Sequence, residues 1–100
     1  MDKILSLLGF AKRAGKIIAG SNAVQRSLLL GKSYLIIIAE DAGLSIKSKM
    51  MRLCNENSVS YLVYGNSEIL SKALGEVNKV IFSVEDENFA KSILDKNEEM

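Results

Sequence analysis

The sequence predicts an α/β protein, a layered sandwich with about four strands in one sheet and helices on both of its faces. Segments with apolar residues at helical spacing alternate along the chain with short apolar runs that are typical of strands. Strict alternation of this kind is typical of a sheet covered by helices. The 100 residues contain no proline and no linker-like or low-complexity tract, so we expect a single domain over residues 1–100.

The chain opens with a helix and a short strand. Residues 3–13 carry apolar side chains at helical spacing, with cationic residues near the end of the segment. Cations suit the negative pole of a helix, and Gly15 provides a stop. The apolar residues 17–19 then predict a strand of three residues.

A second helix follows a glycine turn. Gly20 turns the chain, Ser21 is expected to cap the helix, and Gly31 is expected to end it. Residues 34–39 form a continuous apolar run without alternation, which predicts a central strand buried on both faces.

The second half of the chain repeats the alternation. Acidic residues that open the last helix suit its positive pole, and the tail from Lys96 is expected to fray. The expected elements are a helix capped by Ser45, a strand over 60–64, a helix after 65–67 that ends at Gly75, a strand over 79–84, and a helix after 85–87.

The composition limits the class of protein. Net charge is only +1, yet residues 1–32 carry six basic residues against one acid, whereas residues 53–100 carry four basic residues against nine acids. This split favours a basic face only if folding keeps the two halves apart. No apolar run approaches the roughly 20 residues that cross a bilayer, and no secretion signal is visible, so we expect a cytoplasmic protein without membrane contact.

Residues suited to catalysis are scarce. The sequence has no His and one cysteine, Cys54, which falls on an apolar helix face as a packed thiol would. The segment 31–33 resembles the end of a phosphate loop but precedes a strand instead of following one. Glu40 and Asp41 follow the central strand. Two interpretations of this pair remain open, an acidic metal site and a solvated loop. We expect no enzyme, no metal and no cofactor.

The segment 16–26 is the best candidate for binding. A helix opening presents unpaired N–H groups at a positive pole, which suits a phosphate. Asn22, Gln25 and Arg26 share one helix face, and such side chains contact base edges or phosphates. Lys16 adds sequence-independent attraction. Spacing alone leaves two interpretations open, a nucleic-acid contact or a capped helix with a solvated face.

The residues of this segment also resemble a known family. Gly20-Ser21-Asn22, and the helix that follows over 23–32, resemble the Gly–Thr/Ser–Asn helix of the kink-turn RNA-binding ribosomal protein family, the L7Ae type. Segments 35–41 and 65–75 match the family's next blocks in order, and the opening 7–16 resembles its small bacterial, ribosomal-protein-like members. The similarity covers nearly the whole chain.

The resemblance implies a three-layer α/β/α sandwich that binds a kinked RNA duplex with tandem sheared G·A pairs. It implies that Gly20 lets the backbone approach RNA, that Ser21 and Asn22 bond to it, and that Arg26 replaces a family lysine. It also implies that a loop residue, here matched to Val77, shelters a flipped-out base. Ala23 stands where the family usually has Glu. The expected RNA-binding residues are Lys16, Gly20, Ser21, Asn22, Gln25, Arg26, Val77 and Lys79.

The expected function is therefore non-enzymatic binding of structured RNA, kink-turn-like or ribosomal, through the strand–turn–helix start at 16–26. The expected setting is a monomer that acts with the ribosome or the translation or transcription machinery. The alternative is a protein-interaction module on the same fold that has lost specific RNA recognition.

Overall fold

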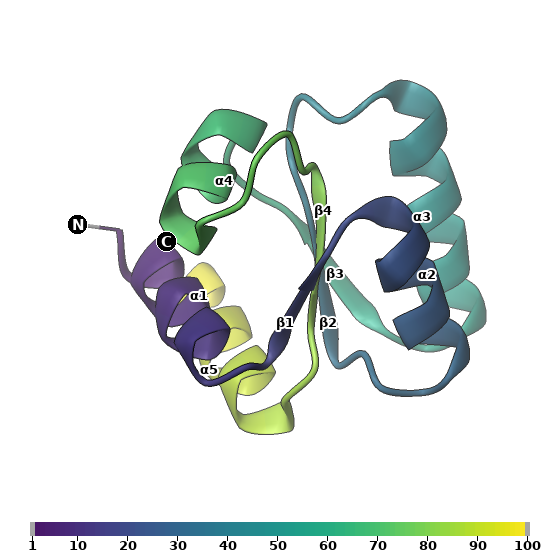
Figure 1. Cartoon of the computed structure of the whole chain (residues 1–100). Helices are drawn as coiled ribbons and strands as arrows, with labels where there is room; N and C mark the ends of the chain where they lie inside the picture. Colours follow the sequence, from purple (N-terminus) through teal and green to yellow (C-terminus); the bar gives the residue numbers. More distant parts are fainter. Residues whose placement is uncertain (1, 100) are drawn as a thin grey trace.

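Helices and strands alternate through residues 2–99, the part of the chain that the computed structural model describes (Figure 1). This order confirms the predicted alternation. The elements are α1 (Lys3–Arg13), β1 (Ile17–Ala19), α2 (Ser21–Leu29), β2 (Leu35–Ile38), α3 (Leu44–Glu56), β3 (Ser60–Val63), α4 (Ser67–Leu74), β4 (Ile81–Val84) and α5 (Glu87–Glu98).

The four strands form one mixed sheet in the order β1-β4-β2-β3. β4 pairs antiparallel with both β1 and β2, and β3 runs parallel to β2. The last strand of the chain is thus inserted between the first two. Because antiparallel neighbours run in opposite directions, the start of β4 lies beside the end of β1.

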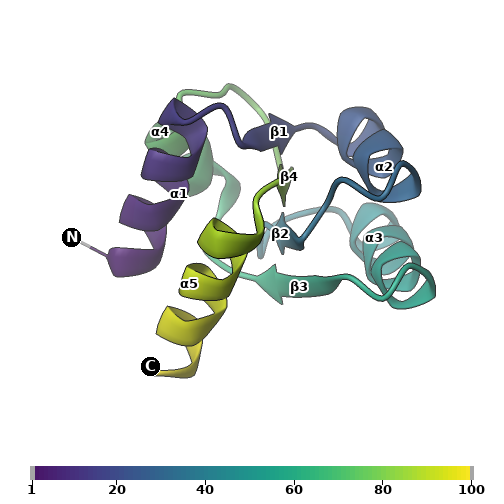
Figure 2. The same ribbon diagram turned by 90° about the horizontal axis from the view of Figure 1, so that it is seen from below.

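The helices form two layers on opposite faces of the sheet. α1, α4 and α5 pack on one face, and α2 and α3 pack on the other (Figure 1). Figure 2, turned by 90°, shows the two groups of helices on opposite sides of the strands. The structure therefore has the α/β/α layers that were predicted.

β2 is the centre of both cores. Its four residues are fully buried, with Leu35 and Ile37 in the core under α1, and Ile36 and Ile38 in the core under α2. Successive strand side chains point to opposite faces, so a strand buried on both faces needs apolar residues at every position. Burial of each such side chain contributes roughly 1.5–3 kcal/mol.

Two predicted helix caps are wrong. Ser21 is the first residue of α2, and its N-cap is Gly20, which offers no side-chain hydrogen bond. The N-cap of α3 is likewise a glycine, Gly43, and not Ser45. In both cases the glycine takes the non-helical cap conformation, so the helix begins before the serine can serve as its cap.

Several boundaries also differ from the prediction. β1 has the predicted bounds, whereas β2, β3 and β4 are shorter than predicted. Beyond the end of β2 the pairing with the chain before β4 continues through a single hydrogen bond, from the N–H of Ala39 to the carbonyl of Val80 (2.8 Å). Gly31 ends α2 as predicted, because it follows the C-cap Leu30 with a left-handed φ of 72°. α5 continues through Lys96 to Glu98, so the expected fraying is not seen there.

Candidate nucleic-acid interface

Two segments far apart in the sequence meet at the start of α2. The N–H of Gly20 donates a hydrogen bond to the carbonyl of Ile81 (2.9 Å), and Ala19 pairs with Phe82 in the sheet. The loop that enters β4 therefore lies against the turn that leaves β1. This contact joins the predicted residues 20–26 to the predicted Lys79.

Lys79 lies over Gly20. A Cβ placed on Gly20 would lie 3.5 Å from the Nζ atom of Lys79, an ordinary contact distance. Gly20 has a φ of +100°, a conformation that residues with a side chain rarely adopt. Glycine is therefore required here by the backbone turn, and the absence of a side chain leaves the lysine ammonium next to bare backbone.

The N–H groups in the first turn of α2 receive no side-chain acceptor from the N-cap residue. Since Gly20 makes no side-chain cap bond, the leading N–H groups are not satisfied from the N-cap as they are in α4, where Asn66 accepts from the N–H of Ile69 (2.8 Å). The positive end of the α2 dipole and the Lys79 ammonium thus lie together. Such an arrangement attracts an anion.

The outer face of α2 continues this polar region. Asn22 and Arg26 are exposed and Gln25 is half-buried, and together with Leu29 and Leu30 they line a shallow depression of about 440 Å³. Arg26 and Lys79 take part in none of the ion pairs formed within residues 2–99. Their charges are therefore free for an external partner. We call Gly20, Ser21, Asn22, Gln25, Arg26 and Lys79 the α2 surface.

Lys16 is not part of the α2 surface. It precedes β1, whereas Gly20 follows it, and about 3.3 Å per strand residue separates them by roughly 13 Å. The carbonyl of Lys16 accepts a hydrogen bond from the N–H of Glu85 (2.8 Å), at the far end of β4. Lys16 is thus separated from the helix start by the length of β1, and Lys79 is the cation that lies beside Gly20.

Val77 lies at the exposed tip of the loop between α4 and β4, with 76% of its surface accessible. The loop is well held at its base. The Ser71 hydroxyl donates to the carbonyl of Lys79 (3.3 Å), and the N–H of Glu76 donates to the carbonyl of Ser71 (2.8 Å). Lys12 of α1 forms an ion pair with Glu76 (2.5 Å), which balances the loop's acidic charge.

The other candidates from the sequence have structural roles. Asp41 accepts bonds from the N–H (2.7 Å) and hydroxyl (2.6 Å) of Ser67 at the start of α4, and these bonds lower the pKa of the carboxyl. Burial raises the pKa of the Cys54 thiol to about 11, so it remains protonated and unreactive at neutral pH. Ser33, from the segment resembling a phosphate loop, is buried and bonded to Ser83 (2.7 Å).

The chain was compared with known protein families. The model of the Ribosomal protein L7Ae/L30e/S12e/Gadd45 family matches residues 2–94 of the chain. The chain belongs to this family. The match confirms the resemblance that the sequence motifs indicated.

Relatives of this L7Ae-family protein include proteins named for RNA binding. It is 28% identical over 88 residues to the RNA-binding protein YlxQ of Bacillus subtilis, covering 88% of each chain. It resembles a Bacillus halodurans structure of unknown function with a TM-score of 0.94 and 31% identity, covering 98% of this chain and 99% of the other. It resembles the Giardia lamblia 15.5kD RNA binding protein with a TM-score of 0.83 and 26% identity, covering 95% and 84%.

Sequence reasoning missed the polar network that holds α2 on the sheet. Ser27 of α2 donates to the Glu85 carboxylate and shares a hydrogen bond with Ser33 (2.7 Å), which also accepts from Ser83 of β4. All three serines are buried. A hydropathy pattern does not mark serine as buried. These hydroxyls come together only because α2 packs on β4 in the folded protein.

Proposed function

We propose that this L7Ae-family protein binds structured RNA without chemistry, through the α2 surface. Family membership and the two relatives named as RNA-binding proteins support the class of ligand. The proximity of Lys79 to Gly20 is the observation that carries the proposal, because a cation then lies beside a helix start that has no side-chain cap. A phosphate would receive both the backbone N–H groups and the ammonium.

Polar residues in the first two turns of α2 suit base recognition. Asn22 carries an amide that can donate to and accept from a base edge, and Arg26 can take either a guanine edge or a phosphate. Gln25, which is half-buried, lines the same depression as these two residues. Ala23, at the position of the family's usual Glu, is exposed next to Asn22 and offers no polar group.

We propose a kink-turn duplex as the target. The sheared G·A pairs would contact Ser21 and Asn22, and Val77 at the loop tip would cover a flipped-out base. Fixation of the loop by Ser71 and by the Lys12–Glu76 ion pair supports this role for Val77, since a sheltering loop must hold its shape. The setting we propose is a cytoplasmic monomer that acts at the ribosome or with the translation or transcription machinery.

The test is a binding titration with a kink-turn duplex and a straight duplex of matched length and composition. We expect the kink-turn RNA to bind at least about tenfold tighter, a difference of about 1.4 kcal/mol. We also expect the affinity to fall steeply as salt rises, because phosphate contacts release counterions. Equal affinity for both duplexes would exclude the kink-turn target, and absence of binding to either would refute the RNA-binding function.

A further inference from the structure

A second surface lies on the other helical layer. α1 and α4 enclose an open groove of about 480 Å³ on the face of the sheet opposite α2. Its walls are mainly apolar, with Leu5 and Phe10 from α1, and Ile69 and Ala73 from α4. The proposed RNA contact does not use this groove.

Large apolar side chains remain accessible in this groove. Phe10 is 52% exposed and Ile69 is 45% exposed, although they stand on different helices. Isolated exposed apolar residues are common on protein surfaces and need no explanation. Two that line the same groove form a continuous apolar area, which is typical of an interaction site.

Between its two walls the groove offers few polar groups to orient a small polar ligand. The helices approach closely there, since a Cβ on Gly9 would lie 3.9 Å from the carbonyl oxygen of Ala73. The one hydroxyl in the lining, that of Ser6, already donates to the carbonyl of Asp2 (3.1 Å). The groove therefore favours apolar side chains over a nucleotide or a sugar.

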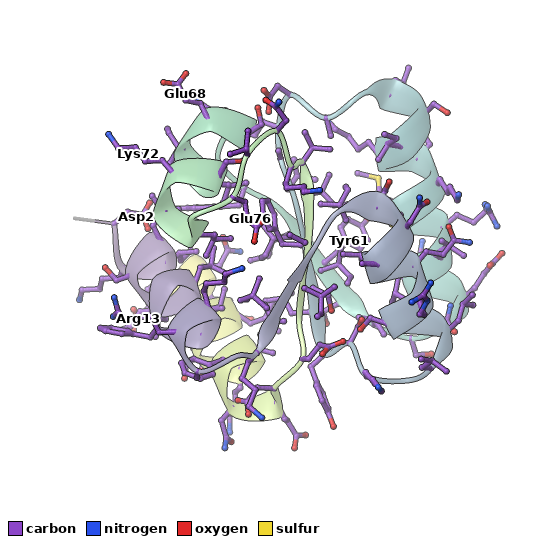
Figure 3. All side chains as sticks on the ribbon, viewed as in Figure 1. Asp2, Arg13, Tyr61, Glu68, Lys72 and Glu76 are labelled. Carbon is purple, nitrogen blue, oxygen red and sulfur yellow. The ribbon has the colours of Figure 1, made fainter. Side chains whose placement is uncertain are left out.

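The rim of the groove is cationic. The Arg13 guanidinium lies 4.8 Å from the centroid of the Phe10 ring, and Lys72 lines the α4 side. Neither cation takes part in an ion pair within residues 2–99. Figure 3 shows Arg13 and Lys72 pointing outward on the same side of the molecule. Glu68, also outward-pointing, is one turn away from Lys72 on α4.

We propose that this groove binds an amphipathic helix of another protein, one whose apolar residues enter the groove and whose flanking carboxylates face Arg13 and Lys72. Helices commonly dock in this way, with apolar anchors one turn apart. Charge complementarity sets the preference for an acidic helix over a basic one. α2 lies on the other face of the sheet from this groove.

The first experiment uses a phage-displayed library of amphipathic helices and the whole protein as bait. The apolar positions of the library are fixed as leucine, and the flanking positions vary between Glu and Lys. We expect selection to enrich Glu at the flanking positions. Absence of enrichment, or enrichment without a bias towards Glu, would overturn the proposal.

The second experiment measures the enriched peptide by fluorescence anisotropy. The double variant Phe10→Ala/Ile69→Ala should weaken its binding at least about tenfold, because two anchors are lost. The charge-reversed variant Arg13→Glu/Lys72→Glu should instead prefer the Lys-flanked version of the same peptide. A reversed preference requires a folded groove, so it cannot result from unfolding. Unchanged peptide preference in this variant would contradict the charge assignment and overturn the proposal.

The matched control is Lys49→Glu/Lys91→Glu, which reverses two exposed charges on α3 and α5 and should leave peptide binding unchanged. Kink-turn RNA affinity should stay the same in Phe10→Ala/Ile69→Ala. A loss of RNA affinity there would assign the groove to RNA and overturn the proposal. If the parent protein self-associates and Phe10→Ala/Ile69→Ala abolishes the self-association, the groove binds a second copy of the chain. That result would also overturn the proposal.

Discussion

The Nζ atom of Lys79 lies 3.5 Å from the point where a side chain on Gly20 would begin, although Gly20 is 59 positions earlier in the chain. The contact exists because β4 is inserted beside β1 and the loop before β4 is held by Ser71. The loop before β4 thereby adds a cation to the positive end of α2. The proposed RNA contact depends on this relationship.

Substitution of Gly20 tests the backbone requirement. Gly20→Ala should lower the free energy of unfolding by roughly 1–3 kcal/mol, because alanine is strained at a φ of +100°. Urea denaturation measures the change. Gly9→Ala is the control, since its new Cβ meets only an ordinary contact inside α1 and should stabilise by about 0.5–1 kcal/mol. A Gly20→Ala protein as stable as the parent would contradict the requirement.

Neutralisation of Lys79 tests the proposed phosphate contact. Lys79→Gln should weaken RNA binding and reduce the slope of log affinity against log salt by about 1, the value for one lost phosphate contact. The measurement is a titration of kink-turn RNA at several salt concentrations. Lys91→Gln on α5 is the matched control and should leave the slope unchanged. Identical slopes for the two variants would remove Lys79 from the contact.

Truncation of the outer face of α2 tests base recognition. Asn22→Ala and Arg26→Ala should each cost about 1–3 kcal/mol of affinity if each side chain contacts a base. Asn22→Ala should also reduce the preference for kink-turn over straight RNA. Arg52→Ala, which removes an exposed cation from α3, is the control and should have little effect. A double Asn22/Arg26 variant that binds as tightly as the parent would show that the site is elsewhere.

The buried serine network predicts a cost in stability. Ser83→Ala removes a fully buried hydroxyl that donates to Ser33 (2.7 Å), so an acceptor loses its partner. We expect the free energy of unfolding to fall by about 1–3 kcal/mol. Ser92→Ala at an exposed position of α5 should change it by less than about 0.5 kcal/mol. Equal stabilities for the two variants would show that the network is not stabilising.

The hydrogen bonds from Ser67 at the start of α4 to Asp41 predict that stability depends on pH in the acidic range. The hydrogen bonds from Ser67 lower the pKa of Asp41 below its ordinary value of 3.8. The carboxylate therefore contributes stability above that value, and the contribution is lost as the pH falls through the lowered pKa. Denaturation of Asp41→Asn should show a weaker decline in the free energy of unfolding over this acidic range than the parent. Parallel declines for the parent and Asp41→Asn would contradict a stabilising role of the Asp41 carboxylate.

The sequence predicted some local features well. The alternation of elements follows from apolar periodicity, and the full burial of β2 follows from its uninterrupted apolar run. Helix caps were less predictable, because Gly20 and Ser21 are both common cap residues and only the backbone angles distinguish them. The grouping of residues 20–26 at one helix start could be predicted from the sequence. The separation of Lys16 from that group could not, because it depends on the extended strand β1 between them.

The sequence by itself determined the α/β layers, the family and the polar start of α2, because these depend on local periodicity and on short motifs. Only the tertiary structure decided that β4 lies beside β1, that Lys79 and not Lys16 accompanies Gly20, and that α1 and α4 leave an apolar groove with a cationic rim. Strand order and helix packing arise from contacts between distant residues, which no local pattern encodes.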